Sequence, residues 1–203
     1  MIIRFSPERF FLQRLIFFKT VSSFYNLPPM MPSLLKSDEA SANRICCILS
    51  DVDGVMTNGE ITYSSCGNEL KTFHVRDGLA VKLWMRSGYP FSIITARKSD
   101  LVQRRSEELG ITSVYQGQTD KLSAAEEIRN REGLEWDEIC YVGDDLPDLP
   151  VIRKVGLAVA PADAAKEVCE SAHWIMKSDG GKGVIRECVE RLLRAKGRWD
   201  EHL

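Results

Sequence analysis

Residues 48–59 read Ile-Leu-Ser-Asp-Val-Asp-Gly-Val-Met-Thr-Asn-Gly, and the rest of the chain is organised around this stretch. An apolar run that begins at Ile45 stops there at two carboxylates, Asp51 and Asp53, followed by a glycine. The apolar part is typical of a buried strand in a parallel sheet, and the polar part is typical of the loop at the strand's carboxyl end. In open α/β sheets, ligands bind at that edge. A plain turn would also explain Asp-Val-Asp-Gly, so the interpretation depends on the motifs that lie further along the chain.

Composition limits the classes of protein that the chain can belong to. Its 203 residues suffice for one domain with a sizeable core. Hydrophobic residues make up 44%, charged residues 28%, and the formal net charge is −2, so we expect no nucleic-acid partner. No apolar run is long enough to span a bilayer, so we expect no membrane partner. Six cysteines without a CxxC pair predict buried thiols in the cytoplasm rather than disulfides or a zinc site: Cys46, Cys47, Cys66, Cys140, Cys169 and Cys188.

The first 44 residues differ from the remainder. They mix arginines with aromatic residues and then run into Leu-Pro-Pro-Met-Met-Pro. A short amphipathic helix over residues 7–19 is one interpretation. We favour a disordered leader, or a start codon assigned upstream of Met30 or Met31. The predicted organisation is therefore a leader over 1–44, one domain over 45–198 and a tail over 199–203.

Strands and helices alternate along the domain. Expected strands lie at 91–95, 113–115, 138–142, 156–159 and 173–176, and expected helices at 77–87, 99–109, 119–131, 163–170 and 184–196. Asp77 is expected to cap the first of these helices, and its buried side is expected to carry Leu79, Val81, Leu83 and Trp84. This alternation predicts an α/β fold, a doubly wound parallel sheet of the Rossmann type with helices on both faces. Only a β-hairpin within 59–74 interrupts it, where apolar and polar residues alternate over 60–63 and 69–75 around Ser-Cys-Gly-Asn.

Polar residues follow several of these strands or begin the next helix: Asp51 with Asp53, Thr95, Lys121, and Asp144 with Asp145. Each has an ordinary explanation by itself, as a helix cap, a solvated lysine or a loop residue. Lys121 lies at the helix end that the dipole makes unfavourable for a cation, which suggests an anionic neighbour. Because the carboxyl ends of parallel strands share one edge, the order of these residues predicts a common pocket.

Such a set of side chains can carry out phosphoryl transfer. Converging carboxylates without Cys or His favour a hard cation, so we expect Mg²⁺ as cofactor. A carboxylate can attack phosphorus to give an aspartyl-phosphate, while Lys121, Thr95 and the amides of loop 53–55 neutralise the transferring group. Asp53 would protonate the leaving alcohol and then accept a proton from the attacking water.

These residues also resemble a known superfamily. Asp51-Val-Asp-Gly-Val, Ile-Ile-Thr95-Ala-Arg97, Lys121 and Gly143-Asp-Asp-Leu-Pro-Asp148 are similar, in this order, to the four motifs of the haloacid dehalogenase superfamily. The segments NGEITYSSCGNELKTFHVRDG, YQGQTDK and GGKGVIRE are similar to the 3-deoxy-D-manno-octulosonate 8-phosphate phosphatase family. The resemblance covers about residues 45–198. Ala96 departs from the glycine usual in the family, a substitution that we expect to be tolerated, and the leader has no counterpart there.

The resemblance assigns roles to the candidate residues. Asp51 would be the nucleophile, Asp53 the general acid and base, and Thr95 and Lys121 the ligands of the phosphoryl group. The Mg²⁺ ligands would be the carboxylates of Asp51 and Asp144 and the carbonyl oxygen of Asp53. Whether Asp145 or Asp148 also reaches the metal is left open.

The resemblance also implies a substrate and an assembly. The substrate would be a small sugar-acid phosphate used in lipopolysaccharide-sugar synthesis, and the protein would be a homotetramer without a large cap domain. The hairpin over 59–74 of one subunit would cover a neighbour's site. Arg97 resembles the family's substrate-contacting arginine, and Arg76 and Lys182 are further candidates for contacts to the substrate.

Three alternatives remain at this point. The same chemistry could act on a nine-carbon, sialic-acid-type phosphate. A non-catalytic oligomerisation module, such as the tail domain of some cytidylyltransferases, is a second possibility, but such a module has no use for Asp53. A phosphoacceptor signalling domain also uses an Asp, a Thr and a Lys, but a second acid there would hasten hydrolysis.

Overall fold

The computed structural model describes residues 40–203, so the interpretations of the leader over 1–39 lie outside the described residues. Residues 40–44 are helical and lead into the first strand. Across residues 40–203, no helix has the length and apolar character needed to cross a membrane.

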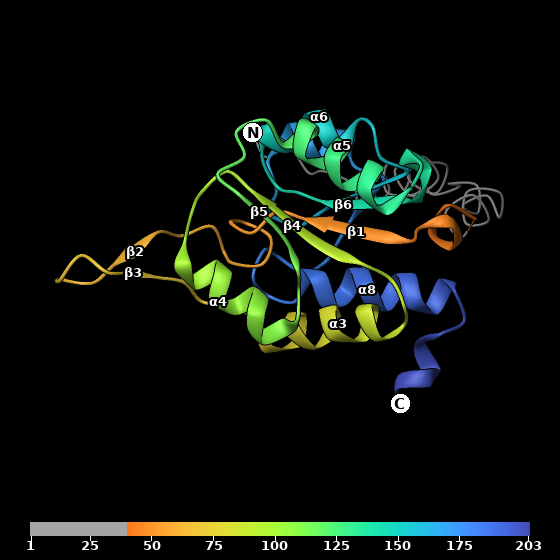
Figure 1. The fold of residues 1–203 in the computed structure, drawn as a ribbon, viewed down its shortest axis with the longest axis horizontal. Helices are drawn as coiled ribbons and strands as arrows, with labels where there is room; N and C mark the ends of the chain where they lie inside the picture. The colour runs from red at the N-terminus through yellow and green to blue at the C-terminus, as the bar shows by residue number, and fades with distance from the viewer. Residues whose placement is uncertain (1–39) are drawn as a thin grey trace, which may run out of the picture. The chain divides into compact units, whose positions relative to one another are not determined.

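Six parallel strands form the central sheet, in the order β5-β4-β1-β6-β7-β8 (Figure 1). They are β1 (Cys47–Ser50), β4 (Phe91–Thr95), β5 (Ser113–Gln116), β6 (Ile139–Val142), β7 (Leu157–Ala160) and β8 (Trp174–Ile175). β1 lies between β4 and β6, with Ile48 opposite Phe91 on one side and Cys140 on the other. After β1 the chain adds β4 and then β5 on one side of β1, and it then crosses to add β6, β7 and β8 on the other side. The crevice at this switch point is where open α/β sheets bind ligands.

Helices cover both faces of the sheet (Figure 1). One layer holds α3 (Val75–Arg86), α4 (Asp100–Leu109) and α8 (Val184–Ala195), and the other holds α5 (Lys121–Glu132), α6 (Leu149–Ile152) and α7 (Lys166–Ser171). β1 serves both cores, because Ile48 belongs to the first cluster and Cys47 and Leu49 to the second. The predicted doubly wound α/β fold is confirmed. Short 3₁₀ helices complete the domain: η1 (Trp136–Glu138), η2 (Leu146–Asp148) and η3 (Trp199–His202).

The predicted hairpin is present but short. β2 (Thr62–Tyr63) and β3 (Glu69–Leu70) pair antiparallel over two residues each and extend away from the sheet (Figure 1). Gly67 takes a φ of +83° in the connecting loop, a conformation that favours glycine. The hairpin forms a separate two-stranded sheet, and among residues 40–203 no large cap domain accompanies it.

Two expectations about α3 are wrong. The helix begins at Val75, so Asp77 lies within its first turn and does not cap it. Instead the Asp77 carboxylate accepts a hydrogen bond of 2.7 Å from the backbone N–H of Arg186, in the first turn of α8. Leu79 is 47% exposed, and the buried side of α3 consists of Asp77, Gly78, Ala80, Val81, Leu83 and Trp84.

The packed structure continues past residue 198. Trp199 in η3 is 4% exposed and belongs to the same core cluster as α3 and α8. The side chains of Arg198 and His202 anchor this turn to Ser87 at the end of α3, over 2.6 and 2.9 Å.

All six cysteines are free thiols. Cys47, Cys140 and Cys188 are buried and Cys46 and Cys169 are partly buried. The expectation of burial is wrong for Cys66, which is exposed in the hairpin loop.

Candidate active site

A pocket of about 250 Å³ lies at the carboxyl edge of the sheet. It is lined by Asp51, Asp53, Gly59, Thr95, Ala96, Arg97, Lys121, Asp144, Asp145, Pro147 and Asp148. All the predicted catalytic residues, the predicted metal ligands and Arg97 are therefore brought together in one place.

The fold positions these side chains through the ends of its elements. Asp51 directly follows β1, Thr95 is the last residue of β4, and Lys121 is the first residue of α5. The backbone N–H of Asp51 donates to the carbonyl of Val142 at the end of β6, over 2.9 Å, and so ties the loop after β1 to the neighbouring strand. Asp144 follows β6 by two residues. Parallel pairing of these strands makes residues that are far apart in sequence converge.

Lys121 is a buried cation between two carboxylates. Its Nζ lies 2.7 Å from Asp51 Oδ2 and 2.6 Å from Asp148 Oδ1, and its side chain is 3% exposed. Burial alone would lower the pKa of Lys121, but the charges of Asp51 and Asp148 outweigh it and raise the pKa above the usual value. Lys121 therefore stays protonated and places a fixed positive charge beside Asp51.

Asp148 holds this arrangement in place. Its Oδ1 accepts hydrogen bonds from Lys121 Nζ and from the hydroxyl of Tyr141, over 2.6 and 2.5 Å. Its Oδ2 accepts from the backbone N–H groups of Asp144 and Asp145, over 3.0 and 3.2 Å. Both oxygens are thus occupied, and Asp148 is fully buried. Tyr141 is not among the residues predicted from the sequence, because a tyrosine inside an apolar strand looks like any other core residue.

Three carboxylates could surround a cation. Oxygens of Asp51, Asp144 and Asp148 lie within 4.8 Å of one another. Oδ1 of Asp51 and Oδ1 of Asp144 are buried without a hydrogen-bond partner, whereas both oxygens of Asp148 are already bonded. Burying a carboxylate oxygen without a partner costs free energy, so a cation beside it is stabilising. Carboxylate oxygens are also the ligands that Mg²⁺ prefers. The residues therefore fit a hard divalent cation held by Asp51 and Asp144, with Asp148 supporting them.

Two glycines allow this close approach. A Cβ on Gly54, which has a φ of +86°, would lie 2.0 Å from Oδ2 of Asp144. A Cβ on Gly143 would lie 2.6 Å from Cγ of Asp148. Both loops are thus closed to any larger residue, which explains why a glycine follows the first acidic pair and another follows β6.

The carboxylates also hold protons more tightly than usual. Burial, and then repulsion from Asp51 and Asp148, raises the pKa of Asp144 to about 8. Burial and the charge of Asp148 raise the pKa of Asp51 to about 6, although Lys121 works in the opposite direction. A divalent cation would favour the ionised forms of both groups.

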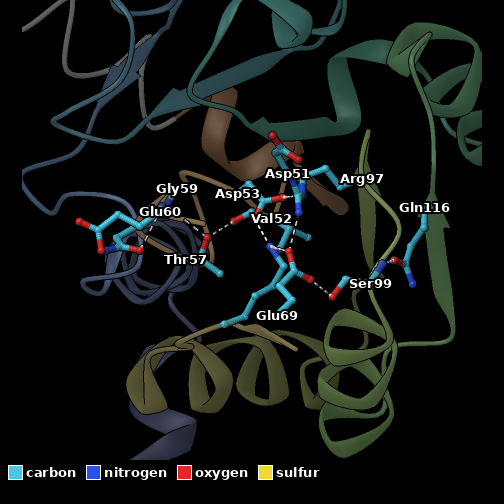
Figure 2. Close-up of polar contacts among 12 residues, drawn as sticks. Asp51, Val52, Asp53, Thr57, Gly59, Glu60, Glu69, Arg97, Ser99 and Gln116 are labelled. Carbon is cyan, nitrogen blue, oxygen red and sulfur yellow. Dashed lines mark hydrogen bonds and ion pairs between the residues drawn. The ribbon is translucent and has the colours of Figure 1, made fainter. Parts of the chain in front are cut away.

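Asp53 is not one of the three clustered carboxylates, although it lines the same pocket, and it contacts the hairpin (Figure 2). Lys71 Nζ forms an ion pair with Asp53 Oδ1, and Arg97 Nε lies 3.7 Å from Asp53 Oδ2. Arg97 also donates to Oε1 of Glu69 over 2.5 Å. Glu69 and Lys71 are not among the site residues predicted from the sequence. Their spacing of two places them on one side of an extended segment, and this was the available signal.

The remaining candidates lie elsewhere or take other roles. Arg76 is exposed, Lys182 pairs with Asp179 over 2.9 Å, and neither lines the pocket. Asp145 lines the pocket and caps η2 by accepting from the N–H of Leu146. Among residues 40–203 no residue other than glycine has a positive φ, so Ala96 adopts an ordinary backbone conformation in place of the usual glycine.

Comparisons with known proteins show which family the chain resembles. Residues 91–187 match the sequence family described as haloacid dehalogenase-like hydrolase. The 3-deoxy-D-manno-octulosonate 8-phosphate phosphatase of Escherichia coli K12 is 43% identical over 162 residues, which are 80% of this chain and 86% of that protein.

Solved structures of proteins with the same name as this relative are also similar to the chain. The crystal structure of the Yersinia pestis enzyme of that name superposes with a TM-score of 0.79 at 39% identity, over 81% of this chain and 89% of the other. That of the Moraxella catarrhalis enzyme, in complex with a magnesium ion, a phosphate ion and a KDO molecule, has a TM-score of 0.79 at 37% identity, over 80% and 94% of the two chains.

Proposed function

The chain belongs to the 3-deoxy-D-manno-octulosonate 8-phosphate phosphatase family of haloacid dehalogenase-like hydrolases, and from this premise we propose that it hydrolyses that sugar-acid phosphate to the free sugar acid and phosphate. The observation that carries the proposal is the pair of unsatisfied buried oxygens on Asp51 and Asp144, next to the Lys121 ammonium in one pocket. A pocket with free carboxylate oxygens and a fixed cation suits a metal-assisted transfer of an anionic group.

We propose that Mg²⁺ is the cofactor, with the carboxylates of Asp51 and Asp144 and the carbonyl of Asp53 as protein ligands. When bound, the ion neutralises charge on the phosphoryl group. The Moraxella catarrhalis enzyme contains a magnesium ion, which supports this choice. The two partnerless oxygens support it independently.

Each residue of the pocket then has a step to perform. An oxygen of Asp51 attacks phosphorus, and the bond from phosphorus to the sugar oxygen breaks, giving an aspartyl-phosphate. Lys121, already 2.7 Å from Asp51 Oδ2, and the hydroxyl of Thr95 bind the transferring group and offset its charge. Asp53 protonates the leaving sugar oxygen and then takes a proton from the water that hydrolyses the intermediate.

The substrate's carboxylate needs a cation outside the phosphate site. Arg97 lines the pocket with its side chain 38% exposed, so we propose that it contacts the sugar acid. Arg76 and Lys182 lie outside the pocket of one chain, and a contact from either to the substrate stays a prediction.

We propose a homotetramer in which hairpins cover neighbouring sites. Of the eight large hydrophobic side chains exposed among the described residues, five lie on the hairpin or the start of α3: Ile61, Tyr63, Leu70, Val75 and Leu79. A hairpin of this size does not fold stably alone, and its exposed apolar side suits a second copy of the chain. We also propose that the protein works in the cytoplasm, in lipopolysaccharide-sugar synthesis, in keeping with six free thiols.

Phosphate release from a panel of sugar-acid phosphates tests the proposal. The purified protein is assayed with eight-carbon and nine-carbon substrates, each with Mg²⁺ and with a chelator. We expect Mg²⁺-dependent release with the highest kcat/KM for the eight-carbon octulosonate 8-phosphate. A higher kcat/KM for a nine-carbon, sialic-acid-type phosphate would identify that compound as the substrate instead. If no phosphate is released from any substrate of the panel, the phosphatase assignment is refuted.

A further inference from the structure

Two charged residues of the hairpin, Glu69 in β3 and Lys71 just after it, contact residues of the active-site pocket. The side chain of Lys71 is 2% exposed and that of Glu69 is 18% exposed. A buried lysine is rare unless it is paired, because removing the ammonium from water is costly. Lys71 has two acidic neighbours, Asp53 in an ion pair and Glu69 at 3.9 Å.

The Asp53 carboxylate is held from both sides. Lys71 contacts Oδ1, and Arg97 Nε lies 3.7 Å from Oδ2. With one cation near each oxygen, rotation of the carboxylate would break one contact or the other. Among the described residues, Lys71 and Arg97 form the ion pairs of the Asp53 side chain, so these two cations restrict where its oxygens lie.

Arg97 is fixed by Glu69 in the same way. Its Nη2 donates to Glu69 Oε1 over 2.5 Å, and Glu69 Oε2 accepts from the hydroxyl of Ser99 over 2.8 Å (Figure 2). Ser99 is the N-cap residue of α4, but its hydroxyl does not cap that helix. The hydroxyl bonds to the hairpin instead, so the hairpin is anchored to the rigid start of α4.

We propose that Glu69 and Lys71 are positioning residues, which aim Arg97 at the sugar acid and Asp53 at the reacting oxygens. The inference rests on the proposed function, because it assumes that Asp53 moves protons and that Arg97 contacts the substrate. It gives the hairpin a role within its own chain, in addition to any contact with a neighbouring subunit. Asp51 is paired with Lys121, whereas Asp53 and Arg97 are paired with residues of the hairpin.

The test compares Lys71→Met, Lys71→Arg and Glu69→Gln with wild type on two substrates. One is the octulosonate 8-phosphate, and the other is p-nitrophenyl phosphate, which has no carboxylate and whose leaving group needs no proton. Lys98→Met is the control, since Lys98 is an exposed lysine next to Arg97. Size-exclusion chromatography and thermal unfolding accompany each variant, so that loss of assembly or of folding is measured separately.

A misplaced Asp53 should impair the second half of the reaction with either substrate. For Lys71→Met we expect kcat to fall about 10- to 100-fold on both substrates, the range in which misplacement of a catalytic group acts. With p-nitrophenyl phosphate, aspartyl-phosphate should form but hydrolyse slowly, which gives a burst of p-nitrophenol close to one per site. Lys71→Arg should recover part of kcat. A merely structural lysine would produce no burst.

A misplaced Arg97 should instead change substrate choice. For Glu69→Gln we expect kcat/KM for the sugar-acid phosphate to fall about tenfold relative to that for p-nitrophenyl phosphate, through KM. The proposal is overturned if Lys71→Met keeps kcat within about twofold of wild type, or if its loss of rate comes without a burst. An inactive wild type on both substrates would instead refute the proposed function.

Discussion

Replacing Lys121 with methionine should destabilise the protein strongly, and more so at high pH. The ammonium lies between Asp51 and Asp148 at 2.7 and 2.6 Å, and Asp148 is fully buried. Removing one partner of a buried ion pair costs about 3–5 kcal/mol, because the other charges remain in a poorly solvated place. For a domain of this size, a loss of about 4 kcal/mol lowers Tm by about 10 °C.

The pH dependence follows from the raised pKa values of the neighbouring acids. The pKa is about 6 for Asp51 and about 8 for Asp144, so the folded state binds protons more tightly than the unfolded state. Their contribution to stability is therefore complete below about pH 4, and it is lost as the pH rises from there through about 6 for Asp51 and about 8 for Asp144. Lys121 lowers both pKa values, so its removal strengthens this trend. At pH 5.5 the acids can take up protons, and we expect the cost of the substitution to fall to about 2 kcal/mol.

Urea unfolding in EDTA at pH 5.5 and pH 8 measures both effects. Lys82→Met, at an exposed position of α3, is the matched control and should change the free energy of unfolding by less than about 0.5 kcal/mol. A loss for Lys121→Met that is the same at both pH values, or that stays below about 1 kcal/mol at pH 8, would contradict the buried arrangement of Lys121 between Asp51 and Asp148.

Three further predictions concern the metal and the hairpin. Asp144→Asn should abolish the rise in Tm that wild type shows on adding Mg²⁺. In EDTA at pH 8 the variant should be more stable than wild type by about 2 kcal/mol, because it removes a partly exposed charge that Asp51 and Asp148 repel. A variant whose Tm still rises with Mg²⁺ would show that Asp144 is not a metal ligand. Gly54→Ala should lower both the stability and the rise in Tm on adding Mg²⁺, because its Cβ would lie 2.0 Å from Oδ2 of Asp144. Gly88→Ala is the control: Gly88 has the same φ of +86°, but a Cβ there would meet no atom within 4 Å, so this variant should lower stability only. Equal rises in Tm for the two variants would count against the close approach of Gly54 and Asp144. Deletion of residues 62–70 should reduce both phosphatase activity and the assembly size measured by light scattering, and an active tetramer without these residues would refute the proposed role of the hairpin.

The sequence predicts best those features that depend on short, continuous patterns. β4 was expected at 91–95 and occupies Phe91–Thr95, because an uninterrupted apolar run bounded by turns allows few alternatives. The meeting of Asp51, Thr95, Lys121 and Asp144 in one pocket was also predictable, since parallel strands place their carboxyl ends at one edge.

The features that the sequence did not predict depend on contacts between distant segments. Asp77 looks like a cap of its own helix, and only the packing of α3 against α8 shows that it accepts from Arg186. Leu79 fits the apolar pattern of α3 but faces outward. Lys71 looks like a solvated strand residue until the hairpin is folded onto Asp53. In each case the local pattern is compatible with two environments, and tertiary packing selects one.

Trapping of the phosphorylated enzyme tests the central claim most directly. The Asp53→Asn variant is mixed with the octulosonate 8-phosphate and Mg²⁺, quenched in acid within the first turnover, digested and mapped by mass spectrometry. We predict one phosphoryl group on the peptide that contains Asp51, absent when Mg²⁺ is chelated and absent from a variant that also carries Asp51→Asn. Turnover by Asp53→Asn at the wild-type rate, or a phosphoryl group on any residue other than Asp51, would contradict the proposed mechanism.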